Sequence, residues 1–224
     1  VAYYPQVVRW NIPDIKNVKF ICDFLSLAKP KVFERRIKEI LGKYFPEKDF
    51  TTKQISLATK AAYAEYAEYL ESVRAEGERY IKKAKETGKP VILLAGRPYH
   101  VDPEINHGIH ELICRFGAIV LSEDSIRPGK EKLVTGVRNQ WTYHSRMYNA
   151  AKFVANAPEN LDIHVVQLVS FGCGVDAVTT DEVRSIVEKS GRLYAQVKID
   201  EISNTGAVTI RLRSLMSVIE LRKK

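Results

Sequence analysis

The feature of this chain best suited to chemistry is a cysteine between two glycines. Residues 170–176 read Ser-Phe-Gly-Cys-Gly-Val-Asp and follow an apolar run, 163–169, that predicts a buried strand. A capping box, Thr179-x-x-Glu182, predicts that a helix opens just beyond them. Cys173 is the only soft, redox-capable side chain of this loop. The pattern leaves three interpretations open: a buried small side chain, a nucleophile, or a ligand of an iron–sulfur cluster completed by cysteines from elsewhere.

A second polar loop, residues 96–108, follows another apolar run at 91–95. Asp102 is a favoured N-cap residue and Pro103 a favoured first helical residue, so a helix is expected at about 103–116. The free N–H groups at a helix start bind anions, and Arg97 adds charge beside them. This loop is therefore interpreted as an anion or ligand site, the alternative being that Arg97 and Asp102 only clamp the loop.

These loops belong to a regular alternation of strands and helices. The first part of the chain, 1–88, is expected to be a mostly helical segment continuing from an upstream domain. The second, 89–224, is expected to be an α/β domain, because four apolar strands alternate with helices. The strands are expected at 91–95, 118–121, 163–169 and 194–199. Such alternation predicts a parallel sheet in a Rossmann-like or flavodoxin-like three-layer fold.

Composition narrows the class of protein. The 224 residues carry a formal charge of +8, but the basic residues are spread along expected helices, which favours solvated surfaces over nucleic-acid binding. No apolar run reaches the roughly 20 residues that span a membrane. The three cysteines are sparse and form no CxxC motif, which argues against a closed zinc site and favours a cytoplasmic location. Because the chain begins at Val1, we expect it to be a fragment or a processed product.

Three stretches together resemble a known family. Residues 94–108 read Leu-Ala-Gly-Arg-Pro-Tyr-His-Val-Asp-Pro-Glu-Ile-Asn-His-Gly, and residues 166–174 read Val-Gln-Leu-Val-Ser-Phe-Gly-Cys-Gly. A third stretch, Ile-Asp-Glu at 199–201, is followed by Gly206 and Arg211. This combination resembles the activase-related proteins of the 2-hydroxyacyl-CoA (2-hydroxyglutaryl-CoA) dehydratase group. The chain looks like the C-terminal part of their dehydratase-like region.

The resemblance implies a role in anaerobic metabolism. Proteins of this group bind a [4Fe–4S] cluster through cysteines from different segments, receive electrons from an ATP-dependent activase domain or subunit, and act on CoA thioesters. By this resemblance Cys173 is the candidate metal ligand. The residues expected to bind a cofactor are those of the first loop: Arg97, Tyr99, His100, Asp102, Asn106 and His107.

The chain also departs from the family pattern, because only one cysteine lies in a plausible cluster loop. We therefore expect the isolated chain to lack a complete cluster and to be inactive alone, and whether it is an enzyme stays open. An alternative function is a phosphate-binding, CoA-binding or partner-docking α/β module without catalytic activity. Homo-oligomerisation also stays open.

Overall fold

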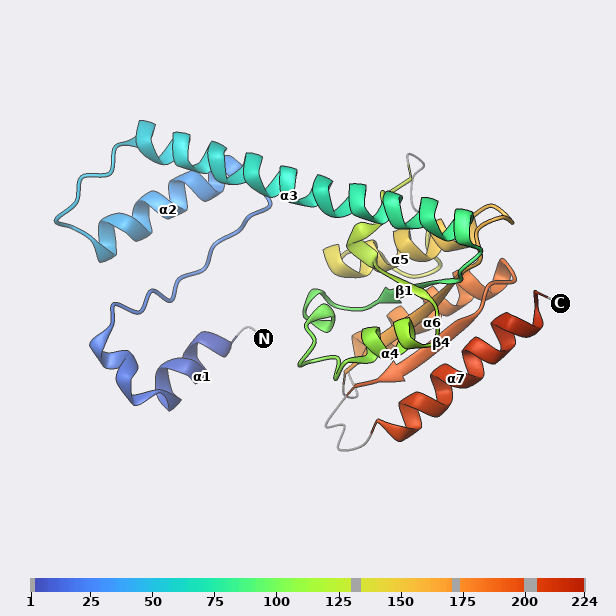
Figure 1. The fold of residues 1–224 in the computed structure, drawn as a ribbon. Helices are drawn as coiled ribbons and strands as arrows, with labels where there is room; N and C mark the ends of the chain where they lie inside the picture. The colour runs from blue at the N-terminus through green and yellow to red at the C-terminus, as the bar shows by residue number, and fades with distance from the viewer. Residues whose placement is uncertain (1–2, 130–133, 171–173, 200–204, 224) are drawn as a thin grey trace. The chain divides into compact units, whose positions relative to one another are not determined.

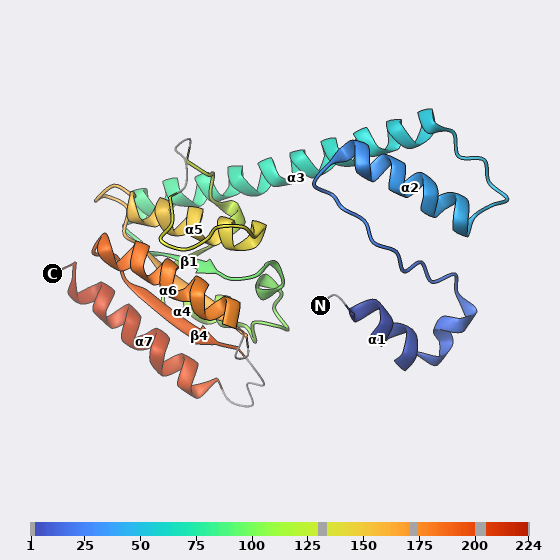
Figure 2. The same cartoon turned by 180° about the vertical axis from the view of Figure 1, so that it is seen from behind.

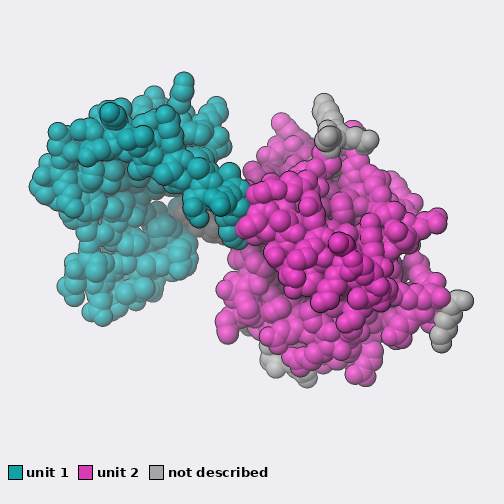
Figure 3. Space-filling model, turned by 45° about the horizontal axis from the view of Figure 1, so that its top comes forward, with its two compact units in different colours: residues 1–69 teal, residues 70–224 magenta. Residues whose placement is uncertain are grey.

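The structure is a computed structural model that describes residues 3–129, 134–170, 174–199 and 205–223. It divides into two compact units, Val1–Tyr69 and Leu70–Lys224, coloured separately in Figure 3. Helix α3, Thr52–Thr87, contributes to both, because the boundary falls within it. The domains expected at 1–88 and 89–224 stay a prediction.

The first unit is helical. Helix α1 (Tyr4–Asn11) and a 3-10 turn (Pro13–Asn17) precede helix α2, Pro30–Tyr44. Helix α3 begins with a reciprocal cap: the Thr51 backbone N–H donates to Gln54 Oε1 (3.0 Å) and the Gln54 N–H donates to Thr51 Oγ1 (3.2 Å). Apolar side chains of α2 and α3 line a groove of about 510 Å³ in this unit.

The second unit contains a four-stranded, fully parallel sheet with strand order β2-β1-β3-β4. The strands are β1 (Val91–Ala95), β2 (Ile119–Ser122), β3 (Ile163–Val169) and β4 (Tyr194–Lys198). Every residue of β1 and β3 is buried, as expected for central strands covered on both faces. The predicted fold class is confirmed: this is a Rossmann-like or flavodoxin-like α/β domain.

Helices cover both faces of this sheet (Figures 1 and 2). Alternate side chains of β1 point to opposite faces, so Leu93 packs in the core beneath α5 (Thr142–Ala155) and α6 (Gly174–Lys189). Ile92 packs in the core beneath α4 (Ile109–Arg115) and α7 (Gly206–Leu221). The two cores fix the positions of β1 and β3, and therefore of the loops that leave their carboxyl ends.

The helix expected at about 103–116 begins later than predicted. Asp102 does cap backbone N–H groups, those of Glu104 (2.9 Å) and Ile105 (3.3 Å), but the chain continues as turns. His107 and Gly108 then adopt positive φ angles of 53° and 70°, which end the turns, and α4 starts at Ile109. The early start was wrong because an aspartate caps a turn as readily as a helix.

Candidate functional site

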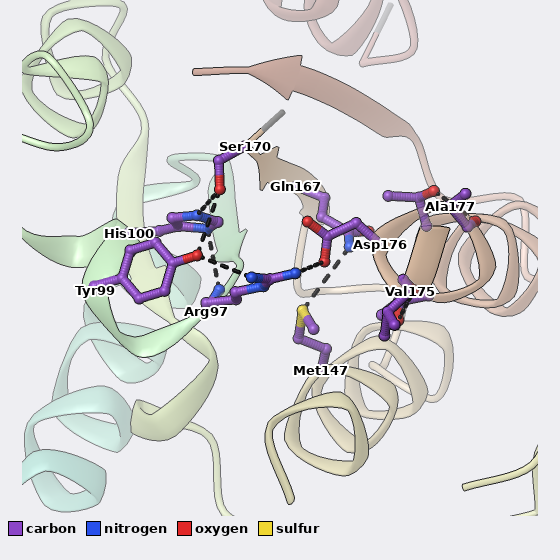
Figure 4. Close-up of polar contacts among 11 residues, drawn as sticks. Arg97, Tyr99, His100, Met147, Gln167, Ser170, Val175, Asp176 and Ala177 are labelled. Atoms are coloured by element: carbon purple, nitrogen blue, oxygen red, sulfur yellow. Dashed lines mark hydrogen bonds and ion pairs between the residues drawn. The ribbon is translucent and has the colours of Figure 1, made fainter. Parts of the chain in front are cut away.

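The carboxyl ends of β1 and β3 form the switch point of the sheet. The chain passes from β1 to β2 on one side, whereas β3 pairs with β1 on the other. In open α/β sheets ligands bind where the strand order reverses in this way. Here the loop after β1 meets the end of β3 and the first turn of α6, and polar side chains from all three come together (Figure 4).

An ion pair joins the first loop to α6. Arg97 Nη2 lies 2.8 Å from Asp176 Oδ1, and the side chains are only 17% and 9% exposed. Asp176 lies in the first turn of α6, where the helix dipole favours a negative charge. Arg97 Nη1 also donates to the Tyr99 hydroxyl at 3.1 Å. The pair spans 79 residues of sequence and holds the first loop against the start of α6.

A buried histidine joins the same loop to the end of β3. The Arg97 backbone N–H donates to His100 Nδ1 (3.0 Å), so the proton of the neutral ring lies on Nε2, which is 3.1 Å from Ser170 Oγ. Burial, and then the charge of Arg97, lowers the pKa of His100 to about 4. The turn is tight, because a Cβ at Gly96 would lie 2.5 Å from His100 Nδ1. His100 is therefore a neutral donor to Ser170 at pH 7.

The other predicted residues of the first loop support it or lie outside the cluster. Asn106 is fully buried: its Nδ2 donates to the His100 carbonyl (3.1 Å) and its Oδ1 accepts from His110 Nδ1 (3.0 Å). Asp102 caps the exposed turn, and His107 is exposed on it. The structure therefore brings Arg97, Tyr99 and His100 together, with Asn106 beneath them.

Cys173, the candidate metal ligand, lies outside the described residues. The residues on either side of its segment are described, and both are held by the first loop. Ser170 contacts the His100 ring and the Tyr99 hydroxyl (3.4 Å), and Asp176 pairs with Arg97. Of the other cysteines, Cys22 is half-buried and Cys114 is exposed.

A [4Fe–4S] cluster does not fit the described residues alone. Within the described ranges, no group of three His, Cys, Asp or Glu side chains is placed to hold a metal ion. Cluster ligands are normally cysteine thiolates, and of the two described cysteines one belongs to the first unit and the other to α4.

Two further titratable groups, Glu123 and His144, lie outside the two loops in which the sequence predicts site residues. Glu123 directly follows β2 and is 3% exposed; burial raises its pKa to about 7, although Arg146 on α5 lies 3.1 Å away and opposes the shift. His144, also on α5, is within electrostatic reach of Asp176 and Arg97, and burial lowers its pKa. Glu123 had a signal in the sequence, because it lies just after the strand expected at 118–121.

Fold and site together define a Rossmann-like or flavodoxin-like α/β protein with a polar, mostly buried cluster at its switch point. The family model described as "CoA enzyme activase uncharacterised domain" matches residues 1–126, more than half of the chain. The chain belongs to this family. No curated protein and no solved structure matches it. Among the described helices, none combines the length and apolar character that crossing a membrane requires.

Proposed function

We propose that the chain is part of an iron–sulfur protein related to the 2-hydroxyacyl-CoA dehydratases and their activase. In this proposal it takes part in electron transfer to, or reductive dehydration of, CoA thioesters, and Cys173 is one ligand of a [4Fe–4S] cluster. An ATP-dependent activase domain or subunit is the proposed electron-donating partner. Family membership supports the connection with activases of CoA enzymes.

One observation carries the assignment of Cys173. The first loop contacts residues on both sides of the Cys173 segment, through His100 to Ser170 and through Arg97 to Asp176. Holding both sides restricts where the intervening thiol can lie, and a ligand cysteine needs such support to keep its geometry. We therefore assign Arg97 and His100 as positioning residues for Cys173.

The remaining ligands of the cluster have to come from other segments or another subunit. The described residues contain no complete set, and Cys114 is exposed on the short helix α4. A cluster shared between segments is consistent with the sparse cysteines of this chain. The proposal therefore concerns one contribution to a composite site.

Anaerobic iron–sulfur reconstitution tests the proposal. It is performed on the chain and on the protein that contains it, and is followed by visible absorbance and iron content. We expect Cys173→Ala to remove the cluster signal, whereas the matched control, Cys114→Ala, keeps it. A full cluster signal in Cys173→Ala refutes the assignment.

Two positioning variants extend this test. Arg97→Met and His100→Phe leave Cys173 in place but remove the contacts to Asp176 and Ser170. We expect both to keep some iron but to change the electron paramagnetic resonance signal of the reduced cluster. Wild-type spectra and cluster content in both variants would show that these residues do not position Cys173.

A further inference from the structure

The two edges of the parallel sheet differ in what lies beside them. At the β2 edge, residues of α3 and β2 line one hollow, and a Cβ at Gly77 on α3 would meet the carbonyl oxygen of Ser125, just after β2. At the other edge, β4 pairs with β3 on one side and with no strand of the described residues on the other. An open edge strand presents backbone groups to which a strand from another chain can add.

The hydrogen bonds around β4 identify the backbone groups on its open side. The Ile199 N–H donates to the Val169 carbonyl (2.8 Å), so Ile199 faces β3. Because successive residues of a strand turn their backbone N–H and C=O groups to alternate sides, Tyr194 and Gln196 direct theirs away from β3. The Gln196 carbonyl indeed accepts from outside the sheet, from Arg211 Nη1 at 2.6 Å. Backbone donors and acceptors are therefore presented at this edge.

A hollow of about 600 Å³ opens at the same edge and is lined by residues of α6, β4 and α7. The two helices cover opposite faces of the sheet (Figures 1 and 2). One arginine from each helix reaches Gln196: Arg184 Nη2 donates to its side-chain oxygen (3.2 Å), and Arg211 donates to its backbone carbonyl. One guanidinium group therefore lies on each face of the edge.

These arginines make the edge beside Gln196 positively charged. Arg211 is exposed, and the Arg184 side chain is 42% exposed. Asp181 pairs with Arg184 only loosely, at 3.7 Å and with 78% of its own side chain exposed, and such a pair contributes little in water. Glu188 also lines the hollow, one turn further along α6. Both arginines therefore remain accessible to carboxylates that approach the edge.

A second copy of the chain is a poor occupant of this edge. Antiparallel pairing of two β4 strands about a two-fold axis would place both copies of Arg184 on one face and both copies of Arg211 on the other. Like charges placed opposite each other destabilise a strand pair. The charge of the edge is instead complementary to an acidic strand.

We propose that β4 binds an extended segment of another protein that carries two consecutive acidic residues. Side chains of an added strand alternate between the faces, so one carboxylate meets Arg184 and the next meets Arg211. Leu215 and Val218 of α7 also line the hollow, so the residue two positions from the second carboxylate, on the same face, is expected to be apolar. None of these residues belongs to the switch-point cluster, so the docking surface goes beyond the proposed function and is tested independently of it.

Fluorescence anisotropy with the labelled peptide Thr-Val-Thr-Glu-Asp-Thr-Val-Thr tests this surface. Each acidic residue has a valine two positions away on its own face, so the peptide fits in either direction along β4. We expect saturable binding that weakens about tenfold or more in Arg211→Met, which corresponds to the loss of one charged hydrogen bond. The matched control, Arg213→Met on the same helix, should bind as the wild type does, because Arg213 lies over the Phe116 ring instead, 6.0 Å from its centroid.

Amide hydrogen exchange separates strand addition from simple charge attraction. The Tyr194 N–H points to the open side, so its exchange should slow by about tenfold or more at saturating peptide. Equal peptide affinity in Arg211→Met and the wild type, or binding without slower Tyr194 exchange, would overturn the inference. Absence of peptide binding would also overturn it, and dimers of Arg211→Met in sedimentation velocity would then show that Arg211 only protects the edge against a second copy.

Discussion

Removing the Arg97 charge should destabilise the second unit far more than removing both partners of its ion pair. Arg97→Met leaves the Asp176 carboxylate buried, with the nearest guanidinium gone. At 2.8 Å and an effective dielectric constant of about 20, the lost attraction is about 6 kcal/mol, of which desolvation of the two groups offsets a part. Breaking one side of a buried pair costs about 3–5 kcal/mol.

The double variant Arg97→Met/Asp176→Leu separates this effect from loss of packing. Because it buries no uncompensated charge, we expect it to be about 2 kcal/mol more stable than Arg97→Met alone. Urea unfolding is followed by fluorescence in a Trp10→Phe background, where Trp141 is the remaining tryptophan and reports on the second unit. The reasoning is refuted if Arg97→Met loses less than about 1 kcal/mol, or if the double variant is no more stable than the single one.

Three further predictions concern single positions. Burial raises the pKa of Glu123 from 4.5 to about 7, so between these pH values the folded state binds a proton that the unfolded state has lost. The free energy of unfolding should therefore fall by on the order of 3 kcal/mol as pH rises from 4.5 to beyond 7. In Glu123→Gln, the free energy of unfolding should not show this decrease with pH. The His100 ring should stay neutral in pH titrations followed by NMR until about pH 4, and stability should fall as pH drops from 6.5 towards 4. Gly77→Ala should lower the melting temperature, because its Cβ would collide with the Ser125 carbonyl oxygen.

Controls for these predictions come from the same chain. Gly42→Ala on α2 is the matched control for Gly77→Ala, because no atom lies within 4 Å of a Cβ added at Gly42. This substitution should raise the free energy of unfolding by about 0.5–1 kcal/mol, because alanine favours a helix more than glycine does. Equal effects at the two glycines would contradict the packing argument. A free energy of unfolding that does not change between pH 4.5 and 8 in the wild type would contradict the burial of Glu123. For His100, an NMR titration midpoint near pH 6.5 would contradict the burial of its ring.

Much of the fold was predictable from the sequence because local patterns determine it. The runs at 91–95 and 163–169 became β1 and β3, since a run made mostly of branched apolar residues suits a strand buried on both faces. The start of α4 was not predictable from Asp102 and Pro103. The positive φ angles of His107 and Gly108 end the turns before α4. Histidine is enriched at positive φ among non-glycine residues, but only a few per cent of those residues adopt it, so the sequence did not predict this bend.

The candidate site was predictable only in part. Both loops were located, because each follows a strand, but their pairing was not. Arg97 was expected to bind an anion or to clamp its own loop with Asp102, and its observed partner is Asp176, 79 residues away. That contact follows from the placement of β3 beside β1, a long-range property that no local spacing contains.

The strand order also has a consequence for how the chain folds. The loops of the switch point are brought together by β1–β3 pairing, which joins Val91 to Ile163 and closes a loop of more than 70 residues, including α4, β2 and α5. Pairing over such separations is slow compared with helix formation or local turns. An intermediate containing only the β1–β2 pair would have neither the Arg97–Asp176 contact nor the His100–Ser170 contact. The order of these contacts in refolding would therefore report when the sheet is complete.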